Sequence, residues 1–456
     1  MFINKVLCRF QNSRFANFLS DSLIFENIDN IAFGLLILTI ISTAFMTSGI
    51  IGCLAGAFSC ACLFRLLVKK GEKIELSFIN KILIVYLLFV VISLMGASYF
   101  VLSLKGFLKT FVYTIFYFSA VYFLSANRKK IIPTIITIAG VTCFEGIAGI
   151  MQNISHVEEI ATWQDTSTLS DPTKAISRAY GTLKPYNPNL LAGYLVAGLS
   201  SVFALFSVSY FKKDKKTAAI YGILFLAVFF AIFVTGSRGA YLGLFGFILV
   251  IFSYAVYFLK KRFGGLKQIK TRYKAIAASA VVFLAGVICL IPSFLNRVLS
   301  IFAFRKDSSI SFRMNVYEAC LRMFSDNKFL GIGVGNKNFR EIYGLYMKTG
   351  YDALGSYCVP LEIAVESGIF ALFFFLVFII LICIRCVKYT LKEGVHPVNK
   401  ILVLSVLLMI TGVMFHGFFD TIFFRPQVQI IFWTNIAIFH SITIRRKRQE
   451  QFRLLK

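Results

Sequence analysis

Residues 360–387, PLEIAVESGIFALFFFLVFIILICIRCV, form an apolar run long enough to cross a lipid bilayer as one helix. Eleven further apolar runs, separated by basic clusters, predict a polytopic membrane bundle of twelve transmembrane helices in an all-α fold. If the first two runs are one helix, interrupted only by Ser48-Gly49, the bundle has eleven. The runs lie near residues 31–47, 48–68, 81–103, 106–126, 130–151, 188–211, 217–235, 238–260, 275–293, 360–387, 400–418 and 426–444.

The composition agrees with this interpretation. Of the 456 residues, 58% are hydrophobic and 15% are charged, and Phe occurs 51 times. An average soluble domain is about 45–50% apolar and about 25% charged. These values exclude a soluble enzyme, a disordered chain and a small secreted domain held by disulfides.

The net charge of +27 is mainly a topology signal, and we expect no nucleic-acid partner. With the N-terminus in the cytoplasm, 32 of the 48 Lys and Arg residues fall in the cytoplasmic segments, as the positive-inside rule requires. The chain then divides into a cytoplasmic segment at 1–30, one membrane domain at 31–444 and a basic cytoplasmic tail at 445–456. We expect a multi-pass protein of a bacterial inner membrane with both termini in the cytoplasm.

Two polar stretches do not fit the bilayer, and both fall on the periplasmic side of this topology. The first is a loop at 152–187 and the second a larger loop at 294–359. In the larger loop, Ser311 to Phe324 has apolar residues three or four apart, which predicts an amphipathic helix on the membrane surface. The run Gly331-Ile332-Gly333-Val334-Gly335 follows no strand, so it predicts a turn rather than a nucleotide loop. The sequence leaves open whether Cys320 and Cys358 form a disulfide.

Two arginines are candidate ligands for an anion. Arg238 lies in the short outside turn Thr235-Gly236-Ser237-Arg238-Gly239, where the alternative is an arginine that reaches the lipid headgroups. Arg313 opens the amphipathic stretch, where a cation opposes the helix dipole; the alternative is a solvated loop charge. Two guanidinium groups on one side of the membrane would match the oxygens of a diphosphate.

The end of the first periplasmic loop has further candidates for substrate binding. They are Arg178, Tyr180, Asn187 and Asn189, in a tract rich in turn-forming Lys-Pro and Asn-Pro pairs. Tyr180 would stack on a sugar ring or, alternatively, belong to the aromatic belt at the membrane surface.

Carboxylates within apolar runs are functional candidates because a charge in a bilayer is costly. Glu145 lies in the middle of its run, whereas Glu362 and Glu366 open theirs, four residues apart and therefore on one helix face. Such a face would hold a general base or a cation. For Glu366, a salt bridge to an outside arginine is the favoured alternative.

His416 and Asp420 are also four residues apart, at the outside end of an apolar run, and Arg425 follows. This trio would relay protons or position a substrate hydroxyl. The alternative is a hydrogen-bonded cluster at a helix end. The sequence has neither an HxxxH nor an HExxH motif, so we expect no metal and no other cofactor.

Together these segments resemble the O-antigen ligase/polymerase superfamily of bacterial inner-membrane proteins. The stretch from Ala179 to Leu195 is closest to the cyanobacterial-type branch, once proposed to transport bicarbonate. Each motif is weak alone, but their order and shared outward side make the set specific. The matching segments are Tyr180-Gly181-Thr182, Asn187 to Ala192, Gly236 to Gly239, Arg313, Asn327 to Gly333, Leu361 to Gly368 and His416 to Asp420.

The resemblance implies a helical bundle with a large periplasmic loop over a cavity. It also implies an enzyme, a glycosyltransferase that moves a glycan from undecaprenyl diphosphate to a hydroxyl of a glycan or lipid acceptor, without metal. In the family, one arginine in the Ser-Arg turn and one in the large loop contact the diphosphate, and these positions match Arg238 and Arg313. In the family, the residue four positions before the leucine that matches Leu361 is a histidine that acts as the base. In this chain that position holds Tyr357.

This substitution leaves the base unassigned. A tyrosine, with a pKa of about 10, is a poor base near neutral pH. Glu362, Glu366 or His416 would take the role, or the protein does something other than ligation. The main alternative is a transporter, or an accessory to one, for bicarbonate or another small solute, in which Glu145, Glu362 and Glu366 line the path. A third is a non-catalytic partner similar to a flippase.

Overall fold

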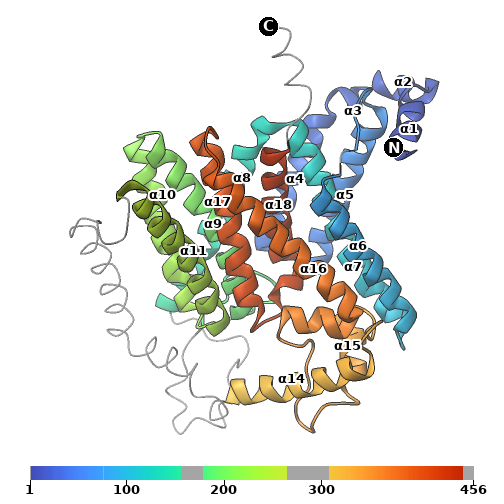
Figure 1. Ribbon diagram of the computed structural model, residues 1–456, viewed down its shortest axis with the longest axis vertical. Helices are drawn as coiled ribbons and strands as arrows, with labels where there is room; N and C mark the ends of the chain where they lie inside the picture. The colour runs from blue at the N-terminus through green and yellow to red at the C-terminus, as the bar shows by residue number, and fades with distance from the viewer. Residues whose placement is uncertain (1, 75, 156–177, 264–307, 445–456) are drawn as a thin grey trace.

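The computed structural model describes residues 2–74, 76–155, 178–263 and 308–444, and within these ranges all regular secondary structure is helical (Figure 1). Eleven of the twelve predicted runs are long helices, and the twelfth, at 275–293, lies outside the described residues. The first two runs form separate helices, so the fused alternative is wrong. The helices are α4 (Ile28–Phe45), α5 (Ser48–Val68), α6 (Phe78–Ile92), α7 (Phe100–Ala126), α8 (Ile131–Ile154), α9 (Pro188–Phe211), α10 (Lys215–Val234), α11 (Arg238–Phe263), α16 (Val359–Leu391), α17 (Pro397–Gly417) and α18 (Pro426–Thr443).

Among the described residues, ten helices are long and apolar enough to span a membrane, and α18 is the exception. It is the most enclosed helix of the bundle, packed against α4, α5, α7, α9 and α17. Its polar side chains, including Gln427, Asn435 and His440, are buried. Because protein rather than lipid surrounds α18, the bundle tolerates this polar composition.

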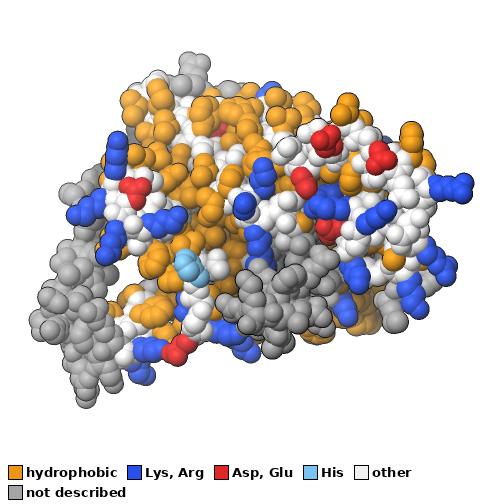
Figure 2. Space-filling view, turned by 90° about the horizontal axis from the view of Figure 1, so that it is seen from above, with side chains coloured by type: hydrophobic (Ala, Val, Ile, Leu, Met, Phe, Trp, Pro, Cys, Tyr) orange, Lys and Arg blue, Asp and Glu red, His pale blue; other side chains and the backbone are white. Residues whose placement is uncertain are grey.

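The described basic loops share one end of the bundle, which we call the basic end (Figure 1). Figure 2 looks onto this end and shows Lys and Arg side chains in several groups around a hydrophobic middle. The loops between α5 and α6, α7 and α8, α9 and α10, and α16 and α17 all lie there. This agrees with the predicted alternation of the spans, and the assignment of this end to the cytoplasm stays a prediction.

Residues 2–26 include three short helices at the basic end, α1 (Phe2–Gln11), α2 (Arg14–Ser20) and α3 (Leu23–Glu26). Ser13 and Ser22 cap α2 and α3 through their side chains. Phe15, Phe18 and Leu23 expose 60%, 77% and 79% of their surface. Apolar side chains next to basic ones suit helices lying in the membrane interface.

One predicted boundary is wrong. The sequence places the break between the third and fourth runs at 104–105, whereas the structure has a 3₁₀ turn, η1 (Ser93–Gly96), and starts α7 at Phe100. The cause is a tertiary contact: a Cβ on Gly96 would lie 2.8 Å from the carbonyl oxygen of Gly331. Close packing of this turn on a distant loop fixes the break, and no local pattern encodes it.

At the opposite end, which we call the α14 end, α14 (Ser308–Asp326) lies across the bundle beside α15 (Asn336–Tyr343) (Figure 1). The predicted amphipathic helix is present. Val316, Ala319, Cys320 and Met323 form its buried face, in a small second core. Met314 and Leu321, which the spacing placed on the apolar face, are exposed. Cys320 and Cys358 are free thiols, so the optional disulfide is not formed.

The glycine run at 331–335 packs into a break in α16. Gly368 has φ 80° inside this helix, and the backbone N–H groups of Ile332 and Gly333 donate to the carbonyls of Val365 and Glu366, each at 2.9 Å. The N–H of Ile369 donates to the carbonyl of Lys328, also at 2.9 Å. The run is thus the predicted turn, and it supplies partners for a helix that the sequence predicted to be unbroken.

This packing predicts that Gly368→Ala destabilises the protein by about 2 kcal/mol, because a side chain there is forced into φ 80°. A Cβ would also lie 2.1 Å from the carbonyl oxygen of Phe329. Thermal unfolding in detergent measures the change. The control is Gly140→Ala in α8, where nothing lies within 4 Å of the added Cβ; it should be neutral or stabilising. Equal effects of the two substitutions would contradict this account.

Candidate functional site

The candidate site lies at the α14 end, where α9, α11, α16 and α18 begin. The N-terminus of a helix carries the positive end of its dipole, so four such ends make this region attractive to anions. Arginines from separate segments add to it: Arg178 before α9, Arg238 at the start of α11, Arg313 on α14 and Arg425 at the N-cap of α18. Thus arginine side chains and helix starts supply positive charge here, beside the negative C-terminal ends of α8, α10 and α17.

The site centres on Arg313, Asp420 and Tyr357. The Nη2 atom of Arg313 lies 4.0 Å from Oδ2 of Asp420, and these side chains are only 19% and 11% exposed. The Cζ atom of Arg313 lies 5.7 Å from the centre of the Tyr357 ring, a cation–π distance. Helix α14, the segment just before α16 and the segment after α17 therefore meet at one point.

Several charges act on Asp420. Burial raises the pKa of its carboxyl above the usual value, and Arg313, Arg425 and Arg178 each lower it. These opposing effects leave the pKa of Asp420 raised. Burial likewise raises the pKa of the Tyr357 hydroxyl, and the charge of Asp420 raises it further. Asp420 is consequently a carboxylate held among arginines, and its pKa is shifted in the direction that makes it a stronger base.

Tyr357 has a strained backbone. Its φ of 54° is unusual for a large side chain and costs about 1–3 kcal/mol. The Tyr317 hydroxyl donates to its carbonyl at 3.3 Å, and the Phe312 ring packs edge-on with centroids 5.8 Å apart. The surrounding contacts therefore hold the ring of Tyr357 against Arg313.

His416 is fully buried beside the turn that carries Arg238. A Cβ on Gly239 would lie 2.6 Å from Cδ2 of His416, and one on Gly193 would lie 3.4 Å from Cε1. Within the described residues, neither ring nitrogen has a hydrogen-bond partner. Because α17 ends at Gly417, Asp420 lies beyond the helix, and the two residues do not share a helix face.

The three buried glutamates accept hydrogen bonds from loops. Glu145 accepts from the backbone N–H of Thr182 at 2.9 Å and from its hydroxyl. Glu362 accepts from the N–H of Ser356 at 2.8 Å and from its hydroxyl at 3.2 Å. Glu366 accepts from the N–H of Gly335 at 3.0 Å, and among the described residues it forms no ion pair. Each carboxylate therefore fastens a loop to the bundle.

The candidates from the end of the first periplasmic loop are engaged in contacts with one another and with neighbouring helix ends. Arg178 donates to the carbonyl of Thr235 at 2.9 Å and to Oδ1 of Asn189 at 2.7 Å, so it links the start of α9 to the end of α10. Asn187 caps α9 through its side chain. Tyr180 is buried, and its ring packs against that of Tyr186 with centroids 5.9 Å apart. These side chains shape one wall of the site.

Sequence reasoning missed the residues that position these candidates. Thr182 and Ser356 hold the glutamates, and Gln152 accepts from the N–H groups of Tyr180 and Gly181 at 3.1 and 2.8 Å. For the glycines around His416 a signal did exist: Gly239 and Gly243 are four apart in α11, the spacing of close helix packing in membranes. Within the described ranges, no three His, Cys, Asp or Glu side chains lie close enough to hold a metal ion.

Comparison with known families adds an independent observation. Residues 223–376 match the model of the family described as O-antigen ligase, about one third of the chain. The match covers Arg238, α14 with Arg313, Tyr357 and both Glu362 and Glu366. It confirms the resemblance to the O-antigen ligase superfamily, while the cyanobacterial-type branch stays a prediction. It also supports glycan transfer of this general type and a multi-pass membrane protein that acts on lipid-linked glycans. No curated protein matches the chain.

The contact between Gly239 and His416 can be tested with a pair of substitutions. Gly239→Ala should destabilise the protein by about 1–3 kcal/mol, because the new methyl group overlaps the imidazole. In a His416→Ala background the overlap is gone, and the same substitution should be neutral or stabilising by up to about 1 kcal/mol. Thermal unfolding of the four proteins measures this coupling. An equal loss in both backgrounds would show that His416 does not fill this space.

Proposed function

We propose that this chain, whose residues 223–376 match the O-antigen ligase family, is a metal-independent membrane glycan transferase. It transfers a glycan from undecaprenyl diphosphate to an acceptor hydroxyl. The observation that carries the proposal is the pair of Arg313 and Asp420, 4.0 Å apart, at an end where four helices begin. This arrangement offers both an anion site and a base. The α14 end would then face the periplasm of a bacterial inner membrane.

Arg238 and Arg313 would bind the diphosphate of the donor. When the bond to the sugar breaks, negative charge builds up on the oxygen that leaves, and positioned guanidinium groups stabilise it. Arg238 is suited to this role because it opens α11 and adds its charge to the helix dipole. A metal ion would be unnecessary, since two arginines would supply the positive charge.

Asp420 would act as the general base in place of the family's histidine. Its deprotonated carboxylate takes the proton of the acceptor hydroxyl while that oxygen bonds to the anomeric carbon of the donor sugar. The bond from this carbon to the diphosphate breaks, and the lipid diphosphate leaves with the electron pair. Arg425 and Arg178, which lower the pKa of Asp420, would keep it ionised between turnovers.

The remaining candidates would position these groups. Tyr357 packs on Arg313, His416 fills the space beside the turn of Arg238, and Glu366 holds the glycine run against α16. Tyr180, Asn187 and Asn189 belong to the wall of the site. None of them needs to exchange a proton with the substrate.

The transporter alternative depends on glutamates that line a path through the membrane. Glu145, Glu362 and Glu366 instead accept hydrogen bonds from Thr182, Ser356 and Gly335 at the α14 end. Carboxylates engaged in this way are poorly placed to carry a solute across the bilayer. This argument favours glycan transfer over transport.

The proposal predicts that Arg238→Ala and Arg313→Ala each lower the transfer rate about 100- to 1,000-fold, because each removes a donor that stabilises the leaving group. The assay follows release of undecaprenyl diphosphate from a lipid-linked glycan by purified protein in EDTA. Arg322→Ala is the matched control on α14, since Arg322 is exposed and donates to the carbonyl of Tyr346. Transfer by wild type that stops in EDTA, or equal loss in Arg322→Ala, would overturn the proposal.

The acid limb of the pH–rate profile tests the role of Asp420. A base works only when deprotonated, so kcat/KM should fall as pH drops through a pKa above the usual aspartate value, because the pKa of Asp420 is raised. Asp420→Asn should lose this limb and about 100-fold or more of the rate. The control is Asp352→Asn, which changes an exposed aspartate paired with Arg340. It should keep both the acid limb and the rate. An unchanged limb in Asp420→Asn would assign the base elsewhere.

A further inference from the structure

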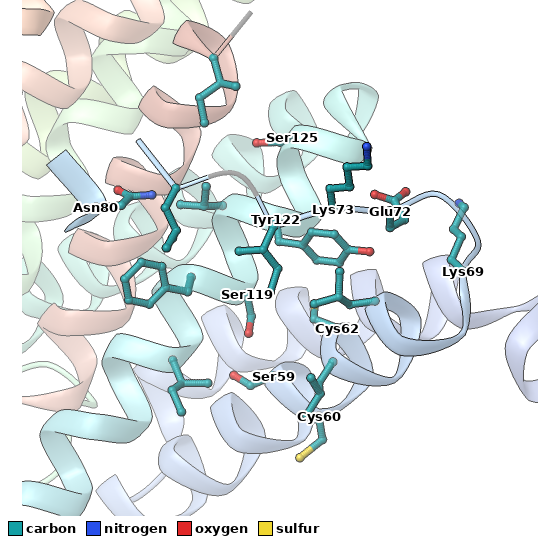
Figure 3. Close-up of a pocket in the computed structure, with 18 of the residues that line it drawn as sticks. Ser59, Cys60, Cys62, Lys69, Glu72, Lys73, Asn80, Ser119, Tyr122 and Ser125 are labelled. Carbon is teal, nitrogen blue, oxygen red and sulfur yellow. The ribbon is translucent and has the colours of Figure 1, made fainter. Parts of the chain in front are cut away.

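A cavity of about 750 Å³ lies at the basic end, on the opposite side of the bundle from the candidate site. The end of α5, the loop after it, the start of α6 and the second half of α7 form its walls, and Arg128 and Ile444 close one edge. In Figure 3, Lys69, Glu72 and Lys73 lie at one end of the cavity, and Ser59 and Cys60 at the other. Its size suits part of a large ligand.

The mouth of the cavity is cationic. Among the described residues that line it, Lys69, Lys70, Lys73 and Arg128 are cationic and Glu72 is anionic. That carboxylate lies 3.3 Å from the buried Arg65, so much of its charge is already compensated. Lys69 lies 3.6 Å from Asp29. The described side chains of the mouth carry a net positive charge, which favours an anionic group.

Below the mouth the lining mixes hydroxyl groups with apolar side chains. Ser119 and Tyr122 place hydroxyl groups there, and Ser59 places another at the far end. Leu63 and Ile115 also line the cavity, and they expose 54% and 38% of their surface on the flank of the bundle, where lipid chains would lie. The cavity thus joins a cationic mouth to a lining that is partly hydroxylated, partly apolar and accessible from the membrane.

The cationic loop is fixed by side chains from outside it. Gln11 of α1, which is 2% exposed, donates to the carbonyls of Leu66 at 2.8 Å and Glu72 at 3.2 Å. The Asn4 side chain accepts from the N–H of Ile74 at 3.0 Å and donates to its carbonyl at 3.2 Å. Both side chains belong to α1, so this helix and the lysine loop are held together as one unit.

We propose that this cavity binds one anionic glycerophospholipid from the leaflet at the basic end. The phosphate would sit among Lys70, Lys73 and Arg128, the glycerol and ester groups would face the hydroxyls of Ser119 and Tyr122, and an acyl chain would leave along Leu63 and Ile115. A soluble phosphate would satisfy only the mouth, and a zwitterionic lipid would bring a second cation to it. A cationic mouth joined to hydroxyl groups and to apolar side chains on the lipid-facing flank matches the three parts of an anionic phospholipid. If the basic end faces the cytoplasm, this is the leaflet whose anionic lipids attract basic segments.

Native mass spectrometry of the full-length protein, titrated with phosphatidylglycerol, tests the proposal. We expect one tightly bound phosphatidylglycerol on wild type and no comparable binding of phosphatidylcholine or glycerol 3-phosphate. Lys70→Gln/Lys73→Gln should weaken the binding about 25-fold, about fivefold for each lysine near the membrane surface. The matched control is Lys212→Gln/Lys216→Gln, which removes two exposed lysines at the same end of the bundle, in the α9–α10 region.

A second variant separates the cavity from surface charge. Ser119→Phe fills the space without changing charge, and it should also abolish tight binding. Wild-type affinity in Ser119→Phe, an equal loss in both lysine pairs, or equal binding of phosphatidylcholine would each overturn the proposal. Binding of glycerol 3-phosphate as tight as that of the lipid would assign the mouth to a soluble phosphate instead. Because these lysines are exposed, their loss should leave the melting temperature unchanged.

Discussion

Asp420 is the group on which the account of the α14 end depends. A carboxylate enclosed by protein loses its hydration, and it stays ionised only if cations lie close to it. Arg313, Arg425 and Arg178 meet this need, and they come from α14, the start of α18 and the segment before α9. Three regions distant in sequence must therefore assemble around one side chain. The strained backbone of Tyr357, held against Arg313, is consistent with such an assembly because strain persists only where surrounding contacts enforce it.

Both ends of the bundle attract anions, for different physical reasons. At the basic end the charge comes from Lys and Arg in loops, which is the usual topology signal of membrane proteins. At the α14 end it comes from arginines that lie beside the starts of α9, α11, α16 and α18, with the ends of α8, α10 and α17 close by. The first arrangement suits a lipid phosphate at a membrane surface. The second, which is more enclosed, suits a diphosphate whose charge increases during a reaction.

Hydropathy and charge alone predicted the helices well, because a bilayer requires each spanning segment to satisfy its own backbone hydrogen bonds. They failed where tertiary contacts decide: the break at Gly368, the end of the third helix at Gly96, and the exposed face of α14 at Leu321. For the site, arginines and acids at the ends of apolar runs were recognisable, since such charges are rare there. Their partners were not, because Ser356, Thr182 and Gln152 are ordinary loop and helix-end residues until the fold brings them to a carboxylate or a backbone N–H.

The most direct measurement of the central claim is a cryo-electron microscopy map of the protein with an undecaprenyl-diphosphate-linked glycan. The account predicts density for the diphosphate within hydrogen-bonding distance of both Arg238 and Arg313, with the anomeric carbon of the sugar on the side of Asp420. A donor whose diphosphate contacts neither arginine, or lies at the basic end, would contradict it.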